Sequence, residues 1–483
     1  MASPLYLAAV DLGATSGRVM LGTWSRNRLR LTEAHRFPNA YRELGAHAYW
    51  EIGTLWHEVQ VGLRRAAAAL PRGAKLASVG VDTWGCDHVL LNDAGRLVFP
   101  VHAYRDNRTQ PGLAALARQG ADRMYAATGI PNVFYNTSLQ LAETVARCPA
   151  ITDLATRCLF LPDYLNFLLS GRAENELTVA STSQLLDVHG RDWSRTALEH
   201  FRIPPTWFTP PVLAGQKLGR VTGMPELAGA QVVAVPGHDT ACAYDAMPAA
   251  PEGGDLFLSS GTWSLVGFEH PQPLLGPAAQ AARVANERTG LGGYRPLTNV
   301  VGLFLLEQTM QDFSQRPKHP REWDALIAAA AALPAPAVLL DPADPAFTAP
   351  KSMRAAIDAQ LKRRKAVAPK HLAGYTRLIC DSIGRGHAAA AANFEQMTGR
   401  KFRRILMVGG GSKNRLLCQA TADAAGIPVV SFNLEGTAVG NMASQLIALG
   451  AVRDLATFRR QLGADLKQKV YAPRGAARLK VES

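Results

Sequence analysis

The sequence predicts an α/β protein with two large domains, and three observations support this fold class. The chain has 483 residues, which exceeds the roughly 250 to 300 residues that one hydrophobic core usually supports. Segments with a strand pattern are followed repeatedly by segments with helical periodicity. Two strand–turn–strand units, at residues 5–24 and 255–268, both turn through glycine and hydroxyl residues. We therefore expect two related halves that face one ligand.

The first half is predicted to open as an antiparallel meander and to continue in alternating elements. Helical patterns cover residues 53–70, where Pro71 ends the helix, and dominate residues 112–198. We expect the latter insertion to cover the substrate side. Pro236-Gly237 marks a turn before a helix that begins near Thr240. Strands are expected at residues 5–11, 18–24, 29–37, 75–81 and 231–235.

The second half repeats this opening in outline. Proline and glycine cluster at residues 247–254, so we place the boundary there and expect domains at 1–247 and 248–483. The uncharged run 325–340 predicts a buried helix, a turn and a buried strand. Further strands are expected at 255–259, 263–268, 293–296, 404–408 and 427–431. Helices are expected at 301–311, 323–332, 371–397 and 414–425.

Composition and charge limit the classes of function. The run 325–340 is shorter than the ~20 residues of a spanning helix, and the apolar residues 5–10 lack the basic start of a secretory signal. The formal charge of +13 comes from scattered residues without aromatic interleaving, which argues against nucleic acid. The six cysteines form no Cys-x-x-Cys pair. We expect a cytoplasmic protein with free thiols and no membrane partner; the sequence does not indicate an oligomeric state.

The stretch Gly237-His238-Asp239-Thr240 is the first candidate for chemistry. Asp239 should stand where a buried strand ends and a helix begins. A carboxylate in that place is exposed yet firmly held. An aspartate after Pro-Gly is also typical of a helix N-cap.

Glycine-rich turns are the second candidate. Asp11 ends a strand and is followed by Ala14 to Arg18, whose small residues let an anion approach the backbone. Asp11 itself suits Mg²⁺ held through water, because this ion prefers oxygen ligands and keeps much of its hydration shell. An ordinary glycine hairpin is the alternative. A second such turn contains Thr262.

A third loop, Gly409-Gly410-Gly411, connects a strand and a helix. It lacks the Gly-x-Gly-x-x-Gly spacing of dinucleotide-binding folds, and no acidic residue ends a strand ~20 residues later. A Rossmann dehydrogenase is therefore excluded. Adjacent glycines do suit an adenosine lying flat against the backbone.

Together these stretches resemble the FGGY family of sugar kinases, whose two ribonuclease-H-like domains share the fold of actin, hexokinase and the heat-shock chaperone ATPases. The resemblance runs in order over nearly the whole chain. Within the family it points to kinases of L-rhamnulose, with fuculokinases as the alternative that the Gly-His-Asp-Thr stretch also matches. It is carried by residues 10–21, 82–87, 103–106, 237–240, 259–264 and 299–303.

The resemblance implies ATP and Mg²⁺ as cofactors and a role for each matched residue. Asp239 would be the base that accepts the proton of the sugar hydroxyl. Trp84 would present an apolar face to the sugar or, alternatively, be a core tryptophan. The ketose would be contacted by Gly85, His238, Asp239, Thr240 and Asn299. The phosphates would be held by Ala14, Thr15, Ser16, Gly17, Arg18 and Thr262, and Gly410 would line the adenosine.

One position departs from the family. Glu307 stands where relatives have glutamine at the nucleotide site. A carboxylate near ATP phosphates is repelled, so Glu307 is expected to point at a ribose hydroxyl, to pair with a cation or to face away. Two other classes of function share parts of this sequence pattern, a chaperone-like or cytoskeletal ATPase and a catalytically silent sugar sensor.

Overall fold

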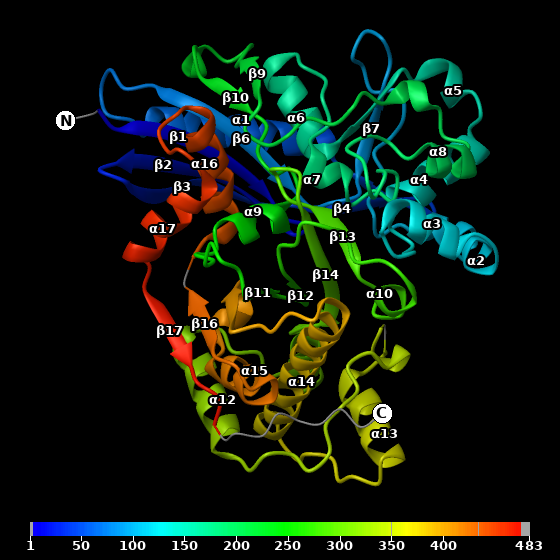
Figure 1. Cartoon of the computed structure of the whole chain (residues 1–483), viewed down its shortest axis with the longest axis vertical. Helices are drawn as coiled ribbons and strands as arrows, with labels where there is room; N and C mark the ends of the chain where they lie inside the picture. The colour runs from blue at the N-terminus through cyan, green and yellow to red at the C-terminus, as the bar shows by residue number, and fades with distance from the viewer. Residues whose placement is uncertain (1–2, 349, 433, 475–483) are drawn as a thin grey trace. The chain divides into compact units, whose positions relative to one another are not determined.

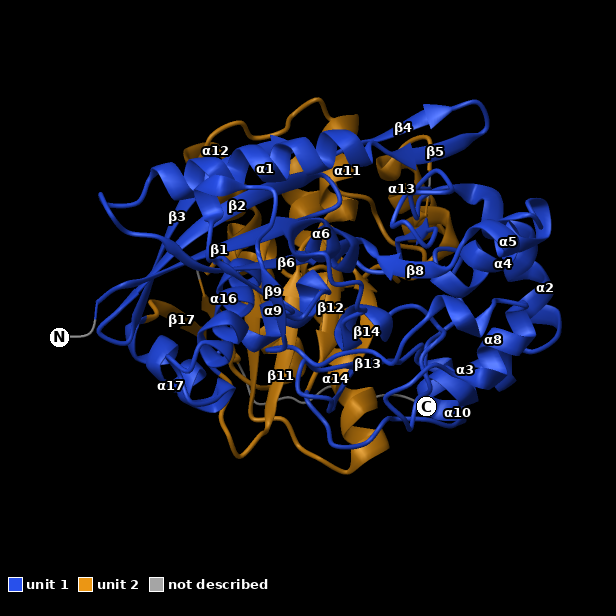
Figure 2. Ribbon diagram, turned by 90° about the horizontal axis from the view of Figure 1, so that it is seen from above, with its two compact units in different colours: residues 1–248, 269–296, 435–465 blue, residues 249–268, 297–434, 466–483 orange. Residues whose placement is uncertain are grey.

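The computed structural model describes residues 3–348, 350–432 and 434–474 (Figure 1). The chain forms two compact units, coloured separately in Figure 2. Unit 1 comprises residues 1–248, 269–296 and 435–465, and unit 2 comprises 249–268, 297–434 and 466–483. In the described ranges no helix is both long and apolar enough to span a membrane.

Unit 1 is built on a mixed sheet with the order β3-β2-β1-β6-β10-β9. β1 pairs antiparallel with β2 and parallel with β6, which places Asp11 beside both Arg18 and Asp82. The predicted meander and the strands that follow it are confirmed. The strands are β1 (Leu5–Leu12), β2 (Ser16–Ser25), β3 (Arg28–Pro38), β6 (Leu76–Thr83), β9 (Lys217–Arg220) and β10 (Gln231–Val233).

The two faces of this sheet carry different helices. α1 (Ile52–Ala68) and α6 (Leu161–Ser170) bury Leu63 and Leu165 in the core that contains Val10 and Val81. Side chains alternate along a strand, so Ser78, Gly80 and Asp82 face the other side. There they meet α16 (Gly436–Ala448). α9 (Asp239–Asp245) packs against α16, and α17 (Leu455–Asp465) completes this side.

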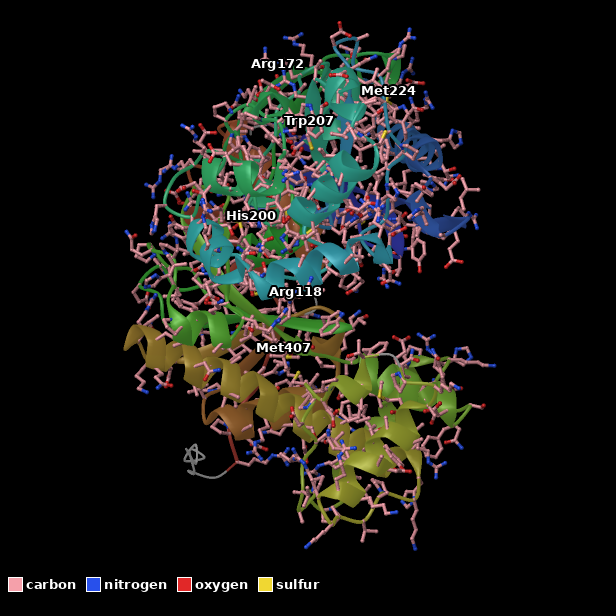
Figure 3. The ribbon with its side chains drawn as sticks, turned by 90° about the vertical axis from the view of Figure 1, so that its right-hand side faces the viewer. Arg118, Arg172, His200, Trp207, Met224 and Met407 are labelled. Carbon is pink, nitrogen blue, oxygen red and sulfur yellow. The ribbon has the colours of Figure 1, made fainter. Side chains whose placement is uncertain are left out.

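The long insertion of unit 1 is largely helical, as predicted, with its own core. Trp207, labelled in Figure 3, is 1% exposed and donates its indole N–H to the Ala155 carbonyl oxygen at 2.9 Å. Two two-stranded antiparallel sheets also belong to unit 1, β4 (Tyr41–Leu44) with β5 (His47–Trp50) and β7 (His88–Leu91) with β8 (Arg157–Phe160). The remaining elements are α2 (Gln110–Arg118), α3 (Ala121–Thr128), α4 (Thr137–Arg147), α5 (Ile151–Leu154), α7 (Leu177–Ala180), α8 (Arg195–Phe201), α10 (Pro277–Ala281) and β13 (Ala285–Arg288).

Unit 2 contains a second mixed sheet with the order β14-β12-β11-β15-β16-β17. Phe268 packs against Phe394 and Phe402, with ring centroids 5.1 and 5.2 Å away, in its core. The strands are β11 (Asp255–Ser260), β12 (Trp263–Gly267), β14 (Tyr294–Val301), of which 297–301 belong to this unit, β15 (Arg404–Val408), β16 (Val429–Phe432) and β17 (Gln468–Tyr471). The helices are α11 (Phe304–Asp312), α12 (Pro320–Ala332), α13 (Met353–Arg363), α14 (Leu372–Thr398) and α15 (Arg415–Ala425).

Two local expectations for unit 2 are wrong. The helix expected from residue 301 begins at Phe304, because β14 continues to Val301 as the partner of Trp263. The run 325–340 does not end in a strand. Only Ile327 and Ala330 of α12 are buried, since an alanine-rich helix forms by propensity without being enclosed.

Candidate active site

The first glycine-rich turn connects β1 and β2 and holds the proposed metal and phosphate residues. The Arg18 Nε donates to Asp11 Oδ2 at 2.8 Å, and the same guanidinium pairs with Glu435 just before α16. The Gly13 N–H donates to the Ser16 carbonyl oxygen at 3.0 Å, which closes the turn around Ala14 and Thr15. A Cβ atom at Gly17 would lie 2.3 Å from the Phe37 ring, so a larger residue would have to displace that ring.

Carboxyl groups cluster around this turn. Burial raises the pKa of Asp11, Arg18 opposes that rise, and Asp239 adds to it. Asp82 is fully buried, and burial followed by the charge of Asp11 raises its pKa well above the ordinary value. Arg18 is thus the cation that balances this acidic group, and a second cation would be stabilised here.

The turn that carries Asp239 is anchored on both sides. The Gly237 N–H donates to Glu176 Oε2 at 2.8 Å, and the Gly237 carbonyl accepts the Thr83 N–H at 2.9 Å. His238 occupies the N-cap position of α9, and Asp239 is its first residue. The N-cap residue of α9 is therefore His238, one residue before the Asp239 that the sequence pattern indicated.

The Asp239 side chain is held but accessible. It is 30% exposed, and Thr240 Oγ1 donates to its Oδ1 at 3.0 Å. His238 Nε2 lies 3.5 Å from the same oxygen. In the described ranges no lysine or arginine pairs with Asp239. A carboxylate without a strong cation partner stays able to accept a proton.

Two residues behind His238 were missed by sequence reasoning. The carboxylate of Glu287 and the guanidinium of Arg295 form a buried pair, and His238 Nδ1 lies 2.9 Å from Glu287 Oε2. No motif marks these positions. Their role depends on burial beside His238, which only the folded chain defines.

Trp84 and Gly85 follow the end of β6. Trp84 is 6% exposed, its ring centroid lies 4.3 Å from that of Trp50, and its indole N–H donates to Asp87 Oδ2 at 2.8 Å. These contacts are those of a core tryptophan. A Cβ atom at Gly85 would lie 2.9 Å from Thr182 Oγ1, so the chain passes closely there.

Unit 2 brings its glycine-rich turns together. A Cβ atom at Gly411 would lie 2.2 Å from Ser260 Oγ, and one at Gly302 would lie 2.8 Å from the Thr262 carbonyl oxygen. Gly410 is exposed, and a Cβ atom added to it would have no neighbouring atom within 4 Å. The exposed backbone at Gly410 leaves room for a flat ligand. Asn299 is exposed on β14, opposite Leu265.

Glu307 lies in the first turn of α11. Its Oε1 pairs with Arg316 Nη2 at 2.6 Å. Of the three placements expected for this carboxylate, the structure shows the pairing with a cation.

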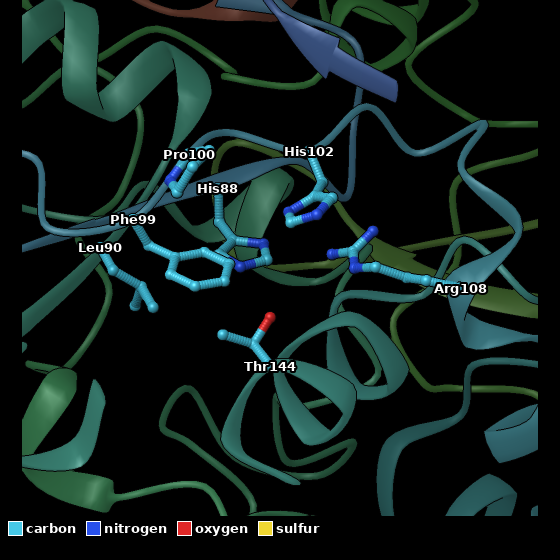
Figure 4. A pocket seen from close by; sticks show the side chains of 7 residues that line it. All are labelled: His88, Leu90, Phe99, Pro100, His102, Arg108 and Thr144. Carbon is cyan, nitrogen blue, oxygen red and sulfur yellow. The ribbon is translucent and has the colours of Figure 1, made fainter. Parts of the chain in front are cut away.

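A small cavity in unit 1 is lined by none of these residues. Figure 4 shows the side chains that do line it. Its volume is about 10 Å³, room for roughly one water molecule and not for a sugar. Arg108 lines it together with His102, and burial lowers the pKa of His102 to about 4. His47, His102 and Asp106 lie close enough to share an ion. Asp106, however, already accepts the N–H groups of Ala48 and Arg108, at 2.6 and 2.7 Å.

Two protein-family models match this chain and show the family to which it belongs. The N-terminal domain of the FGGY family of carbohydrate kinases matches residues 6–244, and its C-terminal domain matches residues 256–449. The chain belongs to this family. It is an ATP-dependent sugar kinase. The kinase resemblance of the sequence is thereby confirmed.

Individual relatives agree with this assignment. The kinase is 37% identical over 474 residues to a rhamnulokinase of Pectobacterium carotovorum subsp. carotovorum (strain PC1), covering 97% of this chain and 93% of that protein. It is 36% identical to a rhamnulokinase of Klebsiella pneumoniae (strain 342), covering 97% and 94%.

Solved structures share the fold at low identity. A gluconate kinase of Lactobacillus acidophilus gives a TM-score of 0.80 at 16% identity, covering 98% of this chain and 94% of that one. The Plasmodium falciparum glycerol kinase with ADP gives 0.78 at 12% identity, covering 98% and 95%. The two-domain, actin- and hexokinase-like α/β fold expected from the sequence is confirmed.

Proposed function

We propose that this kinase transfers the γ-phosphate of ATP to the 1-hydroxyl of L-rhamnulose, giving L-rhamnulose 1-phosphate and ADP. The substrate rests on the rhamnulokinases that are 36–37% identical over 97% of the chain. The observation that carries the chemistry is the Asp239 carboxylate, anchored at the start of α9, 30% exposed and not paired with a lysine or arginine among the described residues.

Asp239 accepts the proton of the sugar hydroxyl as its oxygen attacks the γ-phosphorus. Phosphoryl transfer needs alignment and charge neutralisation more than covalent chemistry, so the carboxylate orients the hydroxyl as well as deprotonating it. Thr240 keeps the carboxylate in place through the 3.0 Å hydrogen bond to Oδ1. His238, Gly85 and Asn299 are the further sugar contacts of the proposal. The contacts of Trp84 favour its core role.

In this proposal, the phosphates of ATP are bound by the backbone of residues 14–17, by Thr262 and by Arg18. Arg18 exchanges its carboxylate partners for phosphate oxygens when the nucleotide arrives, since a guanidinium forms bidentate pairs with both. Gly410 lines the adenosine. Glu307 reaches the nucleotide only if its pair with Arg316 opens.

Mg²⁺ fits the acidic group at the first turn. Asp11 offers a hard carboxylate oxygen at a strand end, and the neighbouring Asp239 adds negative charge that raises the pKa of Asp11. Asp11 would hold the ion through water. When bound, Mg²⁺ neutralises charge on the phosphates that are transferred.

Coupled ADP release across a panel of ketoses tests this function. With MgATP, L-rhamnulose should give the highest kcat/KM among L-rhamnulose, L-fuculose, L-ribulose and D-xylulose. A preference for L-fuculose would make the chain a fuculokinase. Sugar binding without ATP consumption would indicate a sensor, and ATP hydrolysis that ignores sugars would indicate an ATPase of another class.

Asp239→Asn tests the base. Loss of a positioned base lowers kcat by about 10²- to 10⁴-fold, while the Kd for ATP should stay near that of the wild type. Asp93→Asn makes the same chemical change in an exposed turn and serves as the matched control. Turnover of Asp239→Asn close to that of the control would remove Asp239 from the mechanism.

A further inference from the structure

A buried ion pair stands directly behind His238. Glu287 on β13 is 7% exposed and Arg295 on β14 is 1% exposed. The Arg295 guanidinium pairs with Glu287 Oε2 and lies over the ring of Tyr244, 4.9 Å from its centroid. His238 Nδ1 lies 2.9 Å from the same Oε2 and 3.2 Å from Arg295 Nη2. One carboxylate oxygen therefore meets both the imidazole and the guanidinium.

This geometry determines which ring nitrogen of His238 carries a proton. Burial alone would raise the pKa of Glu287, but the charges and hydrogen bonds of His238 and Arg295 lower it to about 2. An ionised carboxylate only accepts, and a guanidinium only donates. The 2.9 Å contact to Glu287 therefore takes a proton on Nδ1, and Arg295, 3.2 Å from the same nitrogen, donates to the carboxylate. When the ring carries a single proton, Nε2 is left as an acceptor.

The other side of the ring faces the reaction. Nε2 lies 3.5 Å from Asp239 Oδ1. In the reversed tautomer, Nε2–H would donate to the Asp239 carboxylate, and that hydrogen bond would make Asp239 a weaker base. With its single proton on Nδ1, the ring cannot donate to that carboxylate through Nε2, and Nε2 can accept a hydrogen bond from the substrate.

We propose that Glu287, anchored by Arg295, is a positioning residue that keeps His238 protonated at Nδ1, so that Nε2 accepts a hydrogen bond from a ketose hydroxyl beside the one that Asp239 deprotonates. The inference rests on the proposed function for the identity of the ketose. It adds a requirement on the substrate. The sugar must present a second hydroxyl as a donor next to the reacting one.

The ion pair sets the proton on the ring through its two contacts. The Glu287 carboxylate accepts from Nδ1 at 2.9 Å, whereas Arg295 Nη2 lies 3.2 Å from the same nitrogen. Because a guanidinium only donates, loss of the carboxylate favours an unprotonated Nδ1 and a proton on Nε2.

The kinetic test compares three variants. Glu287→Gln should raise the KM for L-rhamnulose about tenfold, the effect of losing one neutral hydrogen bond, with the KM for ATP unchanged. Arg295→Met should raise the same KM, because Glu287 loses its anchor. Arg295→Lys keeps the charge and should leave the ketose KM close to that of the wild type.

A matched control separates positioning from packing. Glu269 pairs with the largely buried Arg459 at 2.6 Å and does not touch His238, so Glu269→Gln makes the same change elsewhere in unit 1. It should leave the ketose KM unchanged. Equal ketose KM values for Glu287→Gln and Glu269→Gln would overturn the proposal.

Ring-nitrogen NMR tests the tautomer without turnover. In protein labelled with ¹⁵N-histidine, the His238 signals, identified by their loss in His238→Asn, should show a protonated Nδ1 and an unprotonated Nε2 at neutral pH. Wild-type protein with the proton on Nε2 would overturn the proposal even if every variant failed to fold. Because this readout needs no substrate, it also stands if L-rhamnulose is not phosphorylated.

Discussion

Gly440→Ala should push helix α9 away from α16 and thereby move Asp239, the first residue of α9. A Cβ atom added at Gly440 would lie 1.8 Å from the Cys242 carbonyl oxygen. Cβ contacts below 3.0 Å are essentially absent from folded proteins, so that carbonyl must retreat by about 1.2 Å. A backbone atom cannot rotate aside as a side chain can. The helices must therefore separate.

The cost follows from that displacement. Overpacking a close contact destabilises by about 1 to 3 kcal/mol, and replacing glycine inside a helix returns about 1 kcal/mol. We expect a net loss of about 0 to 2 kcal/mol in the free energy of unfolding, measured by urea titration. A catalytic group displaced by about 1 Å costs on the order of 100-fold in rate, so kcat with L-rhamnulose should fall by that order.

Gly436→Ala is the matched control on the same helix. Its Cβ would lie 3.6 Å from the Ala243 Cα, an ordinary van der Waals contact. Stability and kcat should stay at or slightly above the wild-type values. The reasoning is refuted if Gly440→Ala unfolds and turns over like the wild type, or if both alanine variants are damaged equally.

Three further perturbations test single residues. Glu307→Gln removes an exposed pair with Arg316 that contributes about 0 to 1 kcal/mol; the KM for ATP should fall with kcat unchanged, and an unchanged KM would place Glu307 outside the nucleotide site. Burial lowers the pKa of His387 to about 3. Below about pH 6.5 the unfolded chain therefore binds a proton at this residue that the folded chain does not bind. The free energy of unfolding then falls by up to about 1.4 kcal/mol for each pH unit. Urea unfolding from about pH 7 to pH 5 should show a shallower fall for His387→Gln, and equal slopes would contradict this. Trp84→Phe removes a donor to Asp87 and should cost about 1 to 3 kcal/mol of stability with the ketose KM nearly unchanged; a large rise in KM without loss of stability would instead assign Trp84 to the sugar.

Local patterns were enough to predict most of the scaffold. The meander β1–β3, the strand β11 and the helix α14 all follow from period-two or helical patterns bounded by proline or glycine. The failures occur where propensity and burial disagree. Residues 333–340 are apolar but form no strand, and β14 continues into a stretch whose periodicity suggested a helix.

Only those site residues that belong to recognisable sequence motifs could be predicted. Asp239, His238 and the turn at residues 13–17 are recognisable because glycine and hydroxyl residues follow strand ends. Glu287 and Arg295 are not, since an isolated acid and an isolated base on two short strands carry no signal. Their pairing is a consequence of tertiary structure, and so is the tautomer that they set on His238.

The return of the chain to unit 1 after residue 434 explains how a fully buried carboxylate is tolerated next to the site. Asn441 Nδ2 donates to Asp82 Oδ2 at 2.6 Å, and Gln445 Nε2 donates to the Ala8 carbonyl oxygen at 2.9 Å. Without α16, the Asp82 carboxylate and the Ala8 carbonyl oxygen would lose these hydrogen-bond donors. Both groups lie on the two parallel strands that carry Asp11 and Asp82. A buried acid without a partner costs free energy. Glu435, just before the same helix, also holds Arg18. Residues more than 350 positions apart in sequence therefore form the acidic end of the site, and the charge balance around Asp11 depends on the last helices of the chain as much as on the first turn.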